Sequence, residues 1–458
     1  MTRILLNLLA LAALLGAEPA DWILAARWVV TMDPQHRLIE NGAVAVKGGR
    51  IAAAGARADI DKRFQAAQRI DRPEAILAPG LVNTHTHAPM SLFRGIADDL
   101  RLQDWLEKYI FPAEAGNVNP EFVRWGARLA ALEMMLSGTT TFTDMYYFEE
   151  VVAEAAREAG LRGVLGETVM SFPTPDARTP AEALARTEKF IRRFRQDELI
   201  VPAVAPHALY TNSDETLRAC RALANQYGVP VLIHLSETRR ENDEAVARRG
   251  MSPTRALDSL GLFNGRTVAA HCVWVDAADR AILKSRGVGC AHCPSSNMKL
   301  SSGVAPVTAM LEEGLNVGLG PDGPAGSNND FNMFEEMDLA AKLQKAITGD
   351  PRALPAEKAF EMATLGGARV LGMEKEIGSI EAGKRADLIA IRIDRAHALP
   401  LYGVYSQLVY ALKGSDVRDV MVEGKLIVRD GASLTLRAPG ILSKAREYGA
   451  IVSRSLKN

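Results

Sequence analysis

The strongest constraint on the fold is a series of short apolar segments separated by polar, Ala-rich stretches of helical length. Such runs predict buried strands that alternate with helices, which is the pattern of βα units around a parallel sheet. Polar residues follow many of the runs, and polar residues at the C-terminal ends of eight parallel strands are typical of a (β/α)8 TIM barrel, an α/β fold. The eight expected strands are Ala78–Asn83, Thr139–Thr143, Gly163–Glu167, Val201–Ala205, Pro230–Ile233, Thr267–Ala270, Val288–Ala291 and Val317–Leu319.

Histidines and acidic residues stand at the ends of several of these runs. His85 and His87 follow the first run, and His234 and Asp322 follow two later ones. Successive side chains of a strand point in opposite directions, so two histidines separated by one residue face the same side. Neutral imidazole is a favoured zinc ligand, and catalytic zinc sites keep about three protein ligands and a water. A His-X-His pair also arises by chance, and the repetition at other strand ends is what predicts a metal site.

Two β-rich regions flank the predicted barrel, which we expect to span residues 80–371. Residues 18–79 contain several short apolar runs with turn residues between them, and residues 372–436 contain similar ones. The sequence alone allows these regions to form two separate small domains. Residues 437–458 have mixed charge and predict a C-terminal helical tail.

Residues 1–17 predict a secretory signal peptide. Arg3 precedes the apolar stretch Ile4–Leu15, and the small residues Gly16 and Ala17 follow it. This order is typical of a signal peptide, and the stretch is too short for a stable membrane span. The alternatives are a wrongly assigned start codon and a cytosolic extension. With a functional signal the mature protein is periplasmic or secreted, and otherwise it is cytoplasmic.

Composition argues against nucleic-acid binding and against a disulfide framework. The formal net charge is −1 over 458 residues, which offers no basic surface for a polyanion. The length suits a barrel with a smaller second domain. The chain has four cysteines; Cys290 and Cys293 form a C-x-x-C pair, which elsewhere indicates a redox or zinc motif, but no second cysteine pair accompanies it.

Five stretches form an ordered set of motifs: Pro-Gly-Leu-Val-Asn-Thr-His-Thr-His at 79–87, Val-Leu-Ile-His-Leu-Ser-Glu-Thr at 231–238, Ala-Ala-His-Cys-Val at 269–273, Pro-Ser-Ser-Asn-Met-Lys-Leu at 294–300 and Gly-Leu-Gly-Pro-Asp-Gly at 318–323. They resemble the amidohydrolase superfamily and, within it, the methylthioadenosine/S-adenosylhomocysteine deaminase branch. The resemblance covers nearly everything after residue 20. It implies that the two flanking β regions pair into one small β-sandwich domain beside the barrel.

The chain departs from the family pattern at Pro321, where the family usually has Thr before the metal-binding aspartate. Proline lacks a backbone N–H and restricts φ, so the direction in which Asp322 points is in question. The carboxylate itself is retained.

The resemblance implies one divalent metal ion, expected to be Zn²⁺, with Fe²⁺ and Mn²⁺ as alternatives. His85, His87 and His234 are the implied nitrogen ligands, and Asp322 is the implied oxygen ligand. Binuclear members of the superfamily hold a carboxylated lysine at the end of the fourth strand, and no lysine stands there in this chain. This indicates a single ion. Taken alone, Asp322 beside Gly323 also has the pattern of a turn residue.

The implied catalytic residues are Glu237, His271 and Asp322. Asp322 would accept a proton from the attacking water, and His271 would orient that water. Glu237 would protonate a ring nitrogen and then the leaving amine, as a non-ligand glutamate does in base deaminases. The simpler interpretations are a solvated loop glutamate for Glu237 and a satisfied core histidine for His271.

The resemblance also implies substrate contacts. Glu114 occupies the family position that binds ribose hydroxyls, and a carboxylate accepts two vicinal O–H bonds well. His207 matches a position that contacts the sugar, and Glu237 and Asp322 face the substrate as well. Trp105 either flanks the pocket or belongs to the core.

A carboxylate-bearing substrate would need a basic partner. Arg178, in a Pro-rich loop that we expect to act as a lid, is the candidate partner for the carboxylate of a homocysteine tail. An arginine that some relatives have just before the fourth strand is absent, and Glu198-Leu199-Ile200 occupies the place. This absence weakens the case for such a substrate.

These residues predict a metal-dependent hydrolase that deaminates an adenosine-type nucleoside (5′-methylthioadenosine, S-adenosylhomocysteine or adenosine) to the inosine analogue and ammonia. The alternative is an amidohydrolase that acts on another aminated or chlorinated heterocycle, such as guanine, cytosine or a triazine. Glu114 with His207 favours a ribosyl substrate. A barrel that only binds ligands is disfavoured, because the implied ligand and catalytic set is complete. We expect the protein to form a homo-oligomer. If it is exported, nucleosides outside the cell are more plausible substrates than compounds made in the cytosol.

Overall fold

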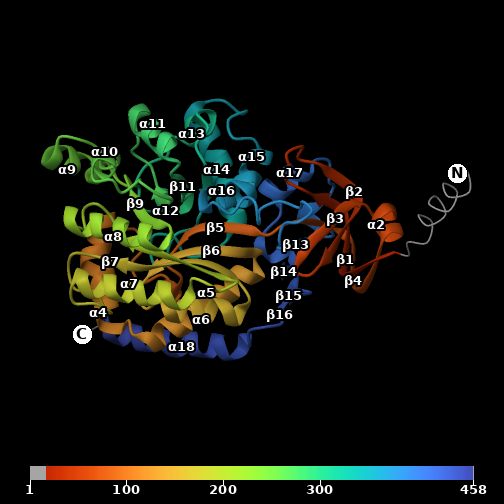
Figure 1. The fold of residues 1–458 in the computed structure, drawn as a ribbon, viewed down its shortest axis with the longest axis horizontal. Coiled ribbons are helices and arrows are strands. Elements are labelled where there is room, and N and C mark those ends of the chain that lie inside the picture. The colour runs from red at the N-terminus through yellow and green to blue at the C-terminus, as the bar shows by residue number, and fades with distance from the viewer. Residues whose placement is uncertain (1–16, 457–458) are drawn as a thin grey trace, which may run out of the picture.

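Eight parallel strands close into a barrel, with helices around it (Figure 1). This computed structural model describes residues 17–456, so the predicted signal peptide lies outside the described residues except for Ala17. The strands follow one another in chain order, and β12 pairs back to β5. The predicted TIM barrel is confirmed. Its strands are β5 (Leu81–Thr86), β6 (Thr139–Tyr146), β7 (Arg162–Val169), β8 (Ile200–Pro206), β9 (Val231–Leu235), β10 (Thr267–His271), β11 (Gly289–His292) and β12 (Val317–Leu319).

The barrel begins three residues later than the sequence predicted, at Leu81 rather than Ala78. The preceding residues end β4 (Phe64–Pro79), which belongs to a different sheet. Gly80 separates the two strands, and a Cβ at this position would lie 2.1 Å from Oγ1 of Thr140. The chain therefore enters the barrel through a position where a side chain does not fit.

Helices follow the strands and cover the outside of the barrel (Figure 1). Several begin at a side-chain cap; Thr238, for example, accepts a hydrogen bond from the backbone N–H of Glu241, which satisfies a free donor of the first turn. The main helices are α5 (Pro120–Leu136), α6 (Glu149–Ala159), α7 (Pro180–Phe194), α8 (Asp214–Tyr227), α9 (Arg239–Arg249), α10 (Pro253–Ser259), α11 (Ala277–Arg286), α12 (Pro294–Lys299), α13 (Val307–Glu312), α14 (Met333–Thr348), α15 (Ala356–Glu361) and α16 (Gly367–Leu371). Short elements are η2 (Ala88–Phe93), α3 (Leu102–Trp105), η3 (Leu106–Ile110), α4 (Phe111–Asn117), η4 (Met362–Gly366), η5 (Ala396–Ala398), α17 (Val404–Ser406), η6 (Gln407–Ala411) and η7 (Gly414–Asp416).

The two ends of the chain share one mixed sheet beside the barrel, in the order β16-β15-β14-β13-β4-β1-β2-β3. The two regions are joined where β13 pairs antiparallel with β4. The β-domain built from both termini is therefore confirmed, as one continuous eight-stranded sheet. Its other strands are β1 (Glu18–Val30), β2 (Leu38–Lys47), β3 (Arg50–Ala56), β13 (Leu388–Arg392), β14 (Val417–Val422), β15 (Lys425–Arg429) and β16 (Ala432–Ser433), and α2 (Arg57–Arg63) follows β3.

A buried ion pair ties the barrel to this sheet. Arg162, the first residue of β7, lies 3.1 Å from Oδ2 of Asp387 and 2.6 Å from Oε1 of Glu423. Its side chain is 2% exposed, so its charge is balanced by these two carboxylates, and the guanidinium also donates to the carbonyl of Glu198 at 3.2 Å.

The C-terminal helix α18 (Ala438–Ser455) lies against α5, with the rings of Phe122 and Tyr448 5.6 Å apart. Ile441 and Val452 are its buried residues. Among the described helices, none has the length and apolar character needed to cross a bilayer.

Candidate metal centre and active site

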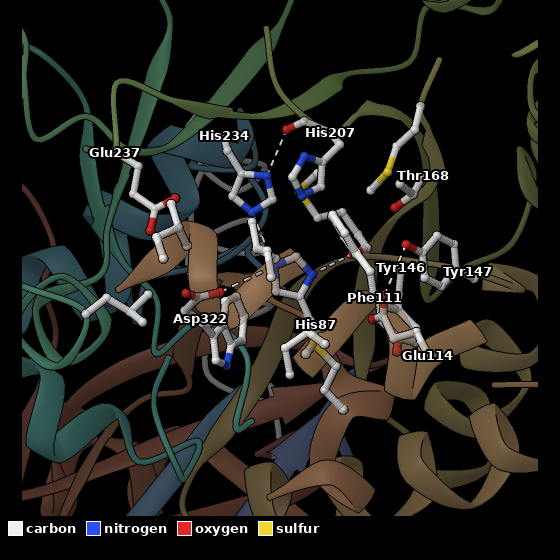
Figure 2. A pocket seen from close by; sticks show the side chains of 18 of the residues that line it. His87, Phe111, Glu114, Tyr146, Tyr147, Thr168, His207, His234, Glu237 and Asp322 are labelled. Atoms are coloured by element: carbon white, nitrogen blue, oxygen red, sulfur yellow. Dashed lines mark hydrogen bonds and ion pairs between the residues drawn. The ribbon is translucent and has the colours of Figure 1, made fainter. Parts of the chain in front are cut away.

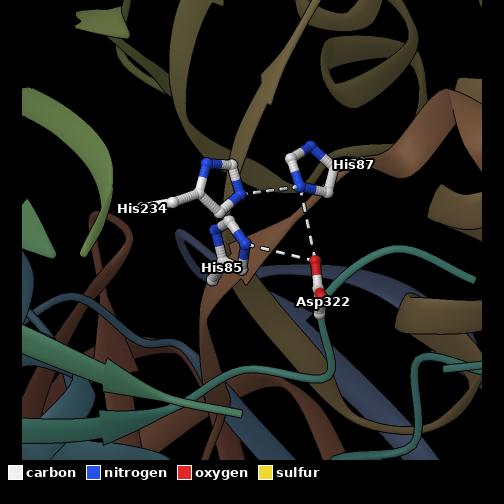
Figure 3. Close-up of side chains that lie close together, drawn as sticks. All are labelled: His85, His87, His234 and Asp322. Atoms are coloured by element: carbon white, nitrogen blue, oxygen red, sulfur yellow. Dashed lines mark hydrogen bonds and ion pairs between the residues drawn. The ribbon is translucent and has the colours of Figure 1, made fainter. Parts of the chain in front are cut away.

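Four side chains meet at the C-terminal end of the barrel (Figure 3). His85 lies near the end of β5, His87 directly follows this strand, His234 lies on β9, and Asp322 follows β12. One donor atom of each lies within 4.8 Å of the others. Oδ1 of Asp322 is 3.2 Å from Nε2 of His85 and 3.3 Å from Nε2 of His87. The structure thus brings together all four residues that the sequence singled out as metal ligands.

The hydrogen bonds of the imidazoles fit this group to a metal ion. Nδ1–H of His87 donates to the carbonyl of Met145 at 2.7 Å, and Nδ1–H of His234 donates to the carbonyl of His207 at 2.8 Å. Both Nε2 atoms are therefore free to act as ligands, and they face each other at 3.2 Å. Metal-binding histidines are held in this way by a second hydrogen bond. Three imidazoles with one carboxylate suit a divalent ion, and zinc above all.

The charge on Asp322 and the charges on the histidines of the ligand group influence one another. Burial lowers the pKa of His85 to about 4. Burial opposes the charged form of His87 as well, but its bond to Asp322 raises the pKa of His87 to about 9. Burial likewise opposes the charge on Asp322, yet the two histidines hold the pKa of its carboxyl well below the usual range. The carboxylate is therefore ionised at neutral pH, as a metal ligand must be.

Pro321 leaves Asp322 aimed at the histidines. The backbone of Asp322 has φ +67°, a strained conformation that is found mostly at functional sites. Its N–H donates to the carbonyl of His85 at 3.2 Å, and its Oδ2 accepts a hydrogen bond from Ser296 at 2.7 Å. These two bonds orient the carboxylate without any contribution from an N–H at position 321.

A pocket opens beside the ligand group (Figure 2). Its lining includes three of the four ligands and most of the residues that the sequence assigned to catalysis and substrate binding. The lining residues are His87, Met90, Leu102, Trp105, Leu106, Ile110, Phe111, Glu114, Met145, Tyr146, Tyr147, Thr168, Met170, His207, Tyr210, His234, Glu237, His271, Leu300 and Asp322.

Glu237 and His271 lie in this pocket, next to the ligand group. Burial, helped by the charge of Asp322, raises the pKa of Glu237 to about 8. Glu237 is only 4% exposed, and its loop is held by its N–H, which donates to Glu241 at 2.7 Å. Nδ1 of His271 pairs with Oδ1 of Asn297 at 2.9 Å, and its Nε2 lies 3.9 Å from Oε2 of Glu237. Glu237 is therefore a buried carboxyl with a raised pKa rather than a solvated loop residue.

Glu114 and His207 line the same pocket. Glu114 is 4% exposed on α4, and burial raises its pKa to about 7 although the hydroxyl of Tyr147 opposes the shift. That hydroxyl donates to Oε2 of Glu114 at 3.3 Å. Burial lowers the pKa of His207 to about 3, so its ring is neutral, and its Nδ1 lies 3.2 Å from Oγ1 of Thr211.

Of the two remaining substrate candidates, Trp105 lines the pocket and Arg178 does not. Trp105 lines the pocket, and its indole N–H donates to the carbonyl of Ala325 at 2.7 Å. Arg178 is exposed and does not reach the pocket. Its backbone N–H donates to the carboxylate of Glu182, and Thr179 caps α7, so the start of this helix directs Arg178 outward.

Asp144 supports the ligand group and was missed from the sequence. Its Oδ1 accepts hydrogen bonds from the hydroxyl of Thr86 and from the N–H of Ala88, both at 2.6 Å. These residues flank His87 on either side, so the buried Asp144 holds the backbone that carries this ligand. Asp144 directly follows the predicted strand Thr139–Thr143, and the rule that identified the histidines also applies to it.

Comparisons with known proteins agree with this geometry. Residues 76–427 match the model of the amidohydrolase family. The chain is 47% identical over 440 residues to the 5-methylthioadenosine/S-adenosylhomocysteine deaminase 1 of Syntrophus aciditrophicus, covering 96% of this chain and 99% of the relative. It is 45% identical over 426 residues to the 5-methylthioadenosine/S-adenosylhomocysteine deaminase of Thermodesulfovibrio yellowstonii, covering 93% and 97%. A solved structure of an adenosine deaminase from Xanthomonas campestris with bound zinc superimposes with a TM-score of 0.94 at 41% identity, covering 96% of this chain and 100% of that one.

Proposed function

The chain belongs to the amidohydrolase family, and on this premise we propose that it hydrolytically deaminates an adenosine-type nucleoside. The candidate substrates are 5′-methylthioadenosine, S-adenosylhomocysteine and adenosine, each converted to the inosine analogue with release of ammonia. One pocket holds the protonated Glu237 beside the metal-ligand group and, further along, the buried Glu114. This arrangement of a proton donor and a ribose acceptor carries the proposal.

The ligand group and Asp322 provide for the attack by water. His85, His87, His234 and Asp322 would hold a divalent ion, and such an ion would supply a water with a pKa lowered toward about 7 as the nucleophile. Asp322 is ionised and accepts a proton from the attacking water. Its Oδ2 already accepts a hydrogen bond from Ser296, which keeps the carboxylate in one orientation as the proton arrives.

Glu237 moves the other proton. With a pKa of about 8, its carboxyl carries a proton at neutral pH and donates it to the ring nitrogen next to the amino-bearing carbon. That carbon becomes more electrophilic. Once water has added to it, the carboxylate of Glu237 accepts the proton of the new hydroxyl group and passes it to the leaving amine. The proton held by Asp322 then restores the protonated form of Glu237. His271, fixed by Asn297, presents Nε2 toward this space and orients the water.

Glu114 and His207 select a nucleoside over a free base. Two vicinal ribose hydroxyls can both donate to the carboxylate of Glu114, and such charge-assisted bonds are stronger than neutral ones. The neutral ring of His207 offers a further polar contact with the sugar. A guanine, cytosine or triazine ring would leave the buried Glu114 with the hydroxyl of Tyr147 but without the two ribose donors, which disfavours the alternative substrates.

The variant Glu237→Gln tests the assignment. It should bind one metal ion per chain as the wild type does and lose about 10²- to 10⁴-fold in kcat, measured as ammonia release from adenosine, 5′-methylthioadenosine and S-adenosylhomocysteine. Glu244→Gln is the matched control, because Glu244 lies on the exposed side of α9. Full activity of Glu237→Gln would refute its role as acid and base. If wild-type enzyme with bound metal released ammonia or chloride only from free heterocycles, the alternative substrate class would be correct.

We further propose that residues 1–17 are a signal peptide and that the mature enzyme is periplasmic or secreted. The basic, apolar and small residues follow the order of a signal peptide in this segment. An exported enzyme would act on nucleosides outside the cytoplasm. Mass spectrometry of the protein from its native cells should find the chain starting after residue 17, and an uncleaved chain in the cytoplasmic fraction would contradict export.

We also propose that the enzyme is a homo-oligomer. Two large apolar side chains, Leu399 and Tyr402, are 57% and 94% exposed in the segment between η5 and α17, and exposed apolar residues of this size favour a protein contact. Light scattering of the purified enzyme measures the mass directly, and a mass of one chain at micromolar concentration would contradict this proposal.

A further inference from the structure

The part of the pocket that would hold the 5′ end of a nucleoside is apolar. In Figure 2, Glu237 lies on one side of the ligand group, and Glu114, Tyr147 and Thr168 lie on the other. A nucleoside whose amino group is at Glu237 and whose ribose is at Glu114 extends its 5′ substituent beyond Glu114. The wall there includes Phe111, which lies one helical turn before Glu114 on α4 and thus on the same face of the helix.

The loop after β7 adds a second aromatic ring to this region. The ring of Phe172 lies 5.8 Å from the ring of Phe111 in an edge-on arrangement. Phe172 is 39% exposed, and it packs on Phe111, which lines the pocket. The loop that the sequence identified as a candidate lid therefore places an aromatic side chain next to the pocket wall, while Arg178 of the same loop is exposed and does not line the pocket.

Cations are missing from the pocket wall. Among the described residues that line it, none is a lysine or an arginine, whereas Glu114, Glu237 and Asp322 are acidic. Two lysines within two residues of lining residues are already paired. Lys108 forms an ion pair with Asp104, and Lys299 contacts Asp98 and the carbonyl of Gly326. Arg101 and Arg178 are exposed.

Resting on the proposed function, we propose that the enzyme is specific for an adenosine with a small, uncharged and apolar 5′ substituent, with 5′-methylthioadenosine as its type. The carboxylate of a homocysteine tail would lie near Glu114 with no cation to pair with it, and a charge removed from water without a partner is strongly disfavoured. The ammonium group of that tail gains little, because the ribose hydroxyls occupy Glu114. A methylthio group instead buries apolar surface, with its sulfur close to Phe111 and Phe172, a favourable contact.

The test compares kcat/KM of the full-length, metal-loaded enzyme for three substrates by ammonia release. We expect 5′-methylthioadenosine to exceed S-adenosylhomocysteine by about 100-fold and adenosine by about 10-fold, a range typical of a pocket that must leave a polar group unpaired. Arg178→Ala should leave these ratios unchanged. Phe172→Arg, which places a cation beside the tail, should raise the rate with S-adenosylhomocysteine relative to 5′-methylthioadenosine by about 10-fold, and Phe172→Gln, which removes the ring without adding charge, should not.

The possible results separate this inference from the proposed function. Deamination of all three substrates at similar rates, or a selective loss with S-adenosylhomocysteine in Arg178→Ala, would overturn the inference and leave the deaminase function intact. A preference for adenosine over 5′-methylthioadenosine would also overturn it, because the tail region would then favour a hydroxyl group. No turnover of any of the three by metal-loaded enzyme would overturn the proposed function and the inference with it.

Discussion

Replacing Glu114 by Gln tests whether the enzyme gives up stability to keep a buried carboxyl in its substrate site. The substitution keeps an oxygen that can accept the hydrogen bond from Tyr147 and removes the ionisable group. Burial raises the pKa of Glu114 from 4.5 to about 7. The folded protein therefore holds this proton more tightly than the unfolded chain does.

The sign and size of the effect follow from that difference. Below about pH 4.5 the carboxyl is protonated in both states, and its contribution to the free energy of unfolding is at its maximum. As the pH rises to 7 and beyond, the unfolded chain gains a solvated carboxylate while the folded protein resists ionisation, so stability is lost. Each unit of difference between the pKa values of the folded and unfolded states corresponds to about 1.4 kcal/mol, so the loss of stability amounts to roughly 3 kcal/mol. A bound divalent cation favours the carboxylate and makes the loss smaller.

Thermal unfolding at pH 5 and pH 8 measures this loss in the metal-free protein. At pH 8, Glu114→Gln should unfold at a temperature roughly 3–6 °C above the wild type, after scaling the usual dependence on chain length to 458 residues. At pH 5 the difference should be much smaller. In the metal-loaded enzyme the same variant should raise KM for nucleosides by roughly 10- to 100-fold, because two charge-assisted bonds become weaker. Tyr147→Phe is the control, because it removes the hydrogen bond to Glu114 but keeps the ionisable carboxyl group. If Glu114→Gln and the wild type were equally stable at pH 8, the reasoning would be refuted.

Three further results are expected. Asp144→Asn should weaken zinc affinity by about 10- to 100-fold in a competition titration with a chromophoric chelator, because the carboxylate holds the backbone on both sides of His87; unchanged affinity would contradict this role. Arg162→Ala should cost about 3–5 kcal/mol in unfolding experiments, since it removes the buried cation that pairs with Asp387, although Glu423 keeps Arg385; a cost below 1 kcal/mol would count against it. Removal of metal by a chelator should abolish ammonia release, and added Zn²⁺ should restore it.

The barrel was predictable because its signal is local. Each strand is a short apolar run followed by a polar residue, and the C-terminal ends of parallel strands in a closed barrel meet at one rim. This rule places the polar strand-end residues at one rim, and the resemblance to the amidohydrolase superfamily implies His85, His87, His234 and Asp322 as the ligands among them. The structure brings the donor atoms of these four residues within 4.8 Å of one another.

Pairing between distant strands was not predictable in the same way. The apolar pattern of β1 does not specify which strands pair with it. In the structure, β1 pairs with β2 on one side and with β4 on the other. The junction between the two termini depends on β13 lying against β4, more than 300 residues apart in the chain. Backbone hydrogen-bonding groups are nearly the same in every residue, so they do not specify which strands pair. Only the packing of side chains across the whole sheet selects these neighbours.

The sequence by itself determined the barrel and the polar residues at its rim, because periodicity and strand-end position are properties of short segments. Its motifs, through their resemblance to the amidohydrolase superfamily, indicated the metal ligands and the residues for acid–base chemistry. Only the tertiary structure decided the protonation of Glu237, which depends on burial and on the charge of Asp322. It also decided that Asp144 supports His87 and that Arg178 points outward. A pKa and a side-chain direction depend on every group nearby, and those groups come from segments far apart in the chain.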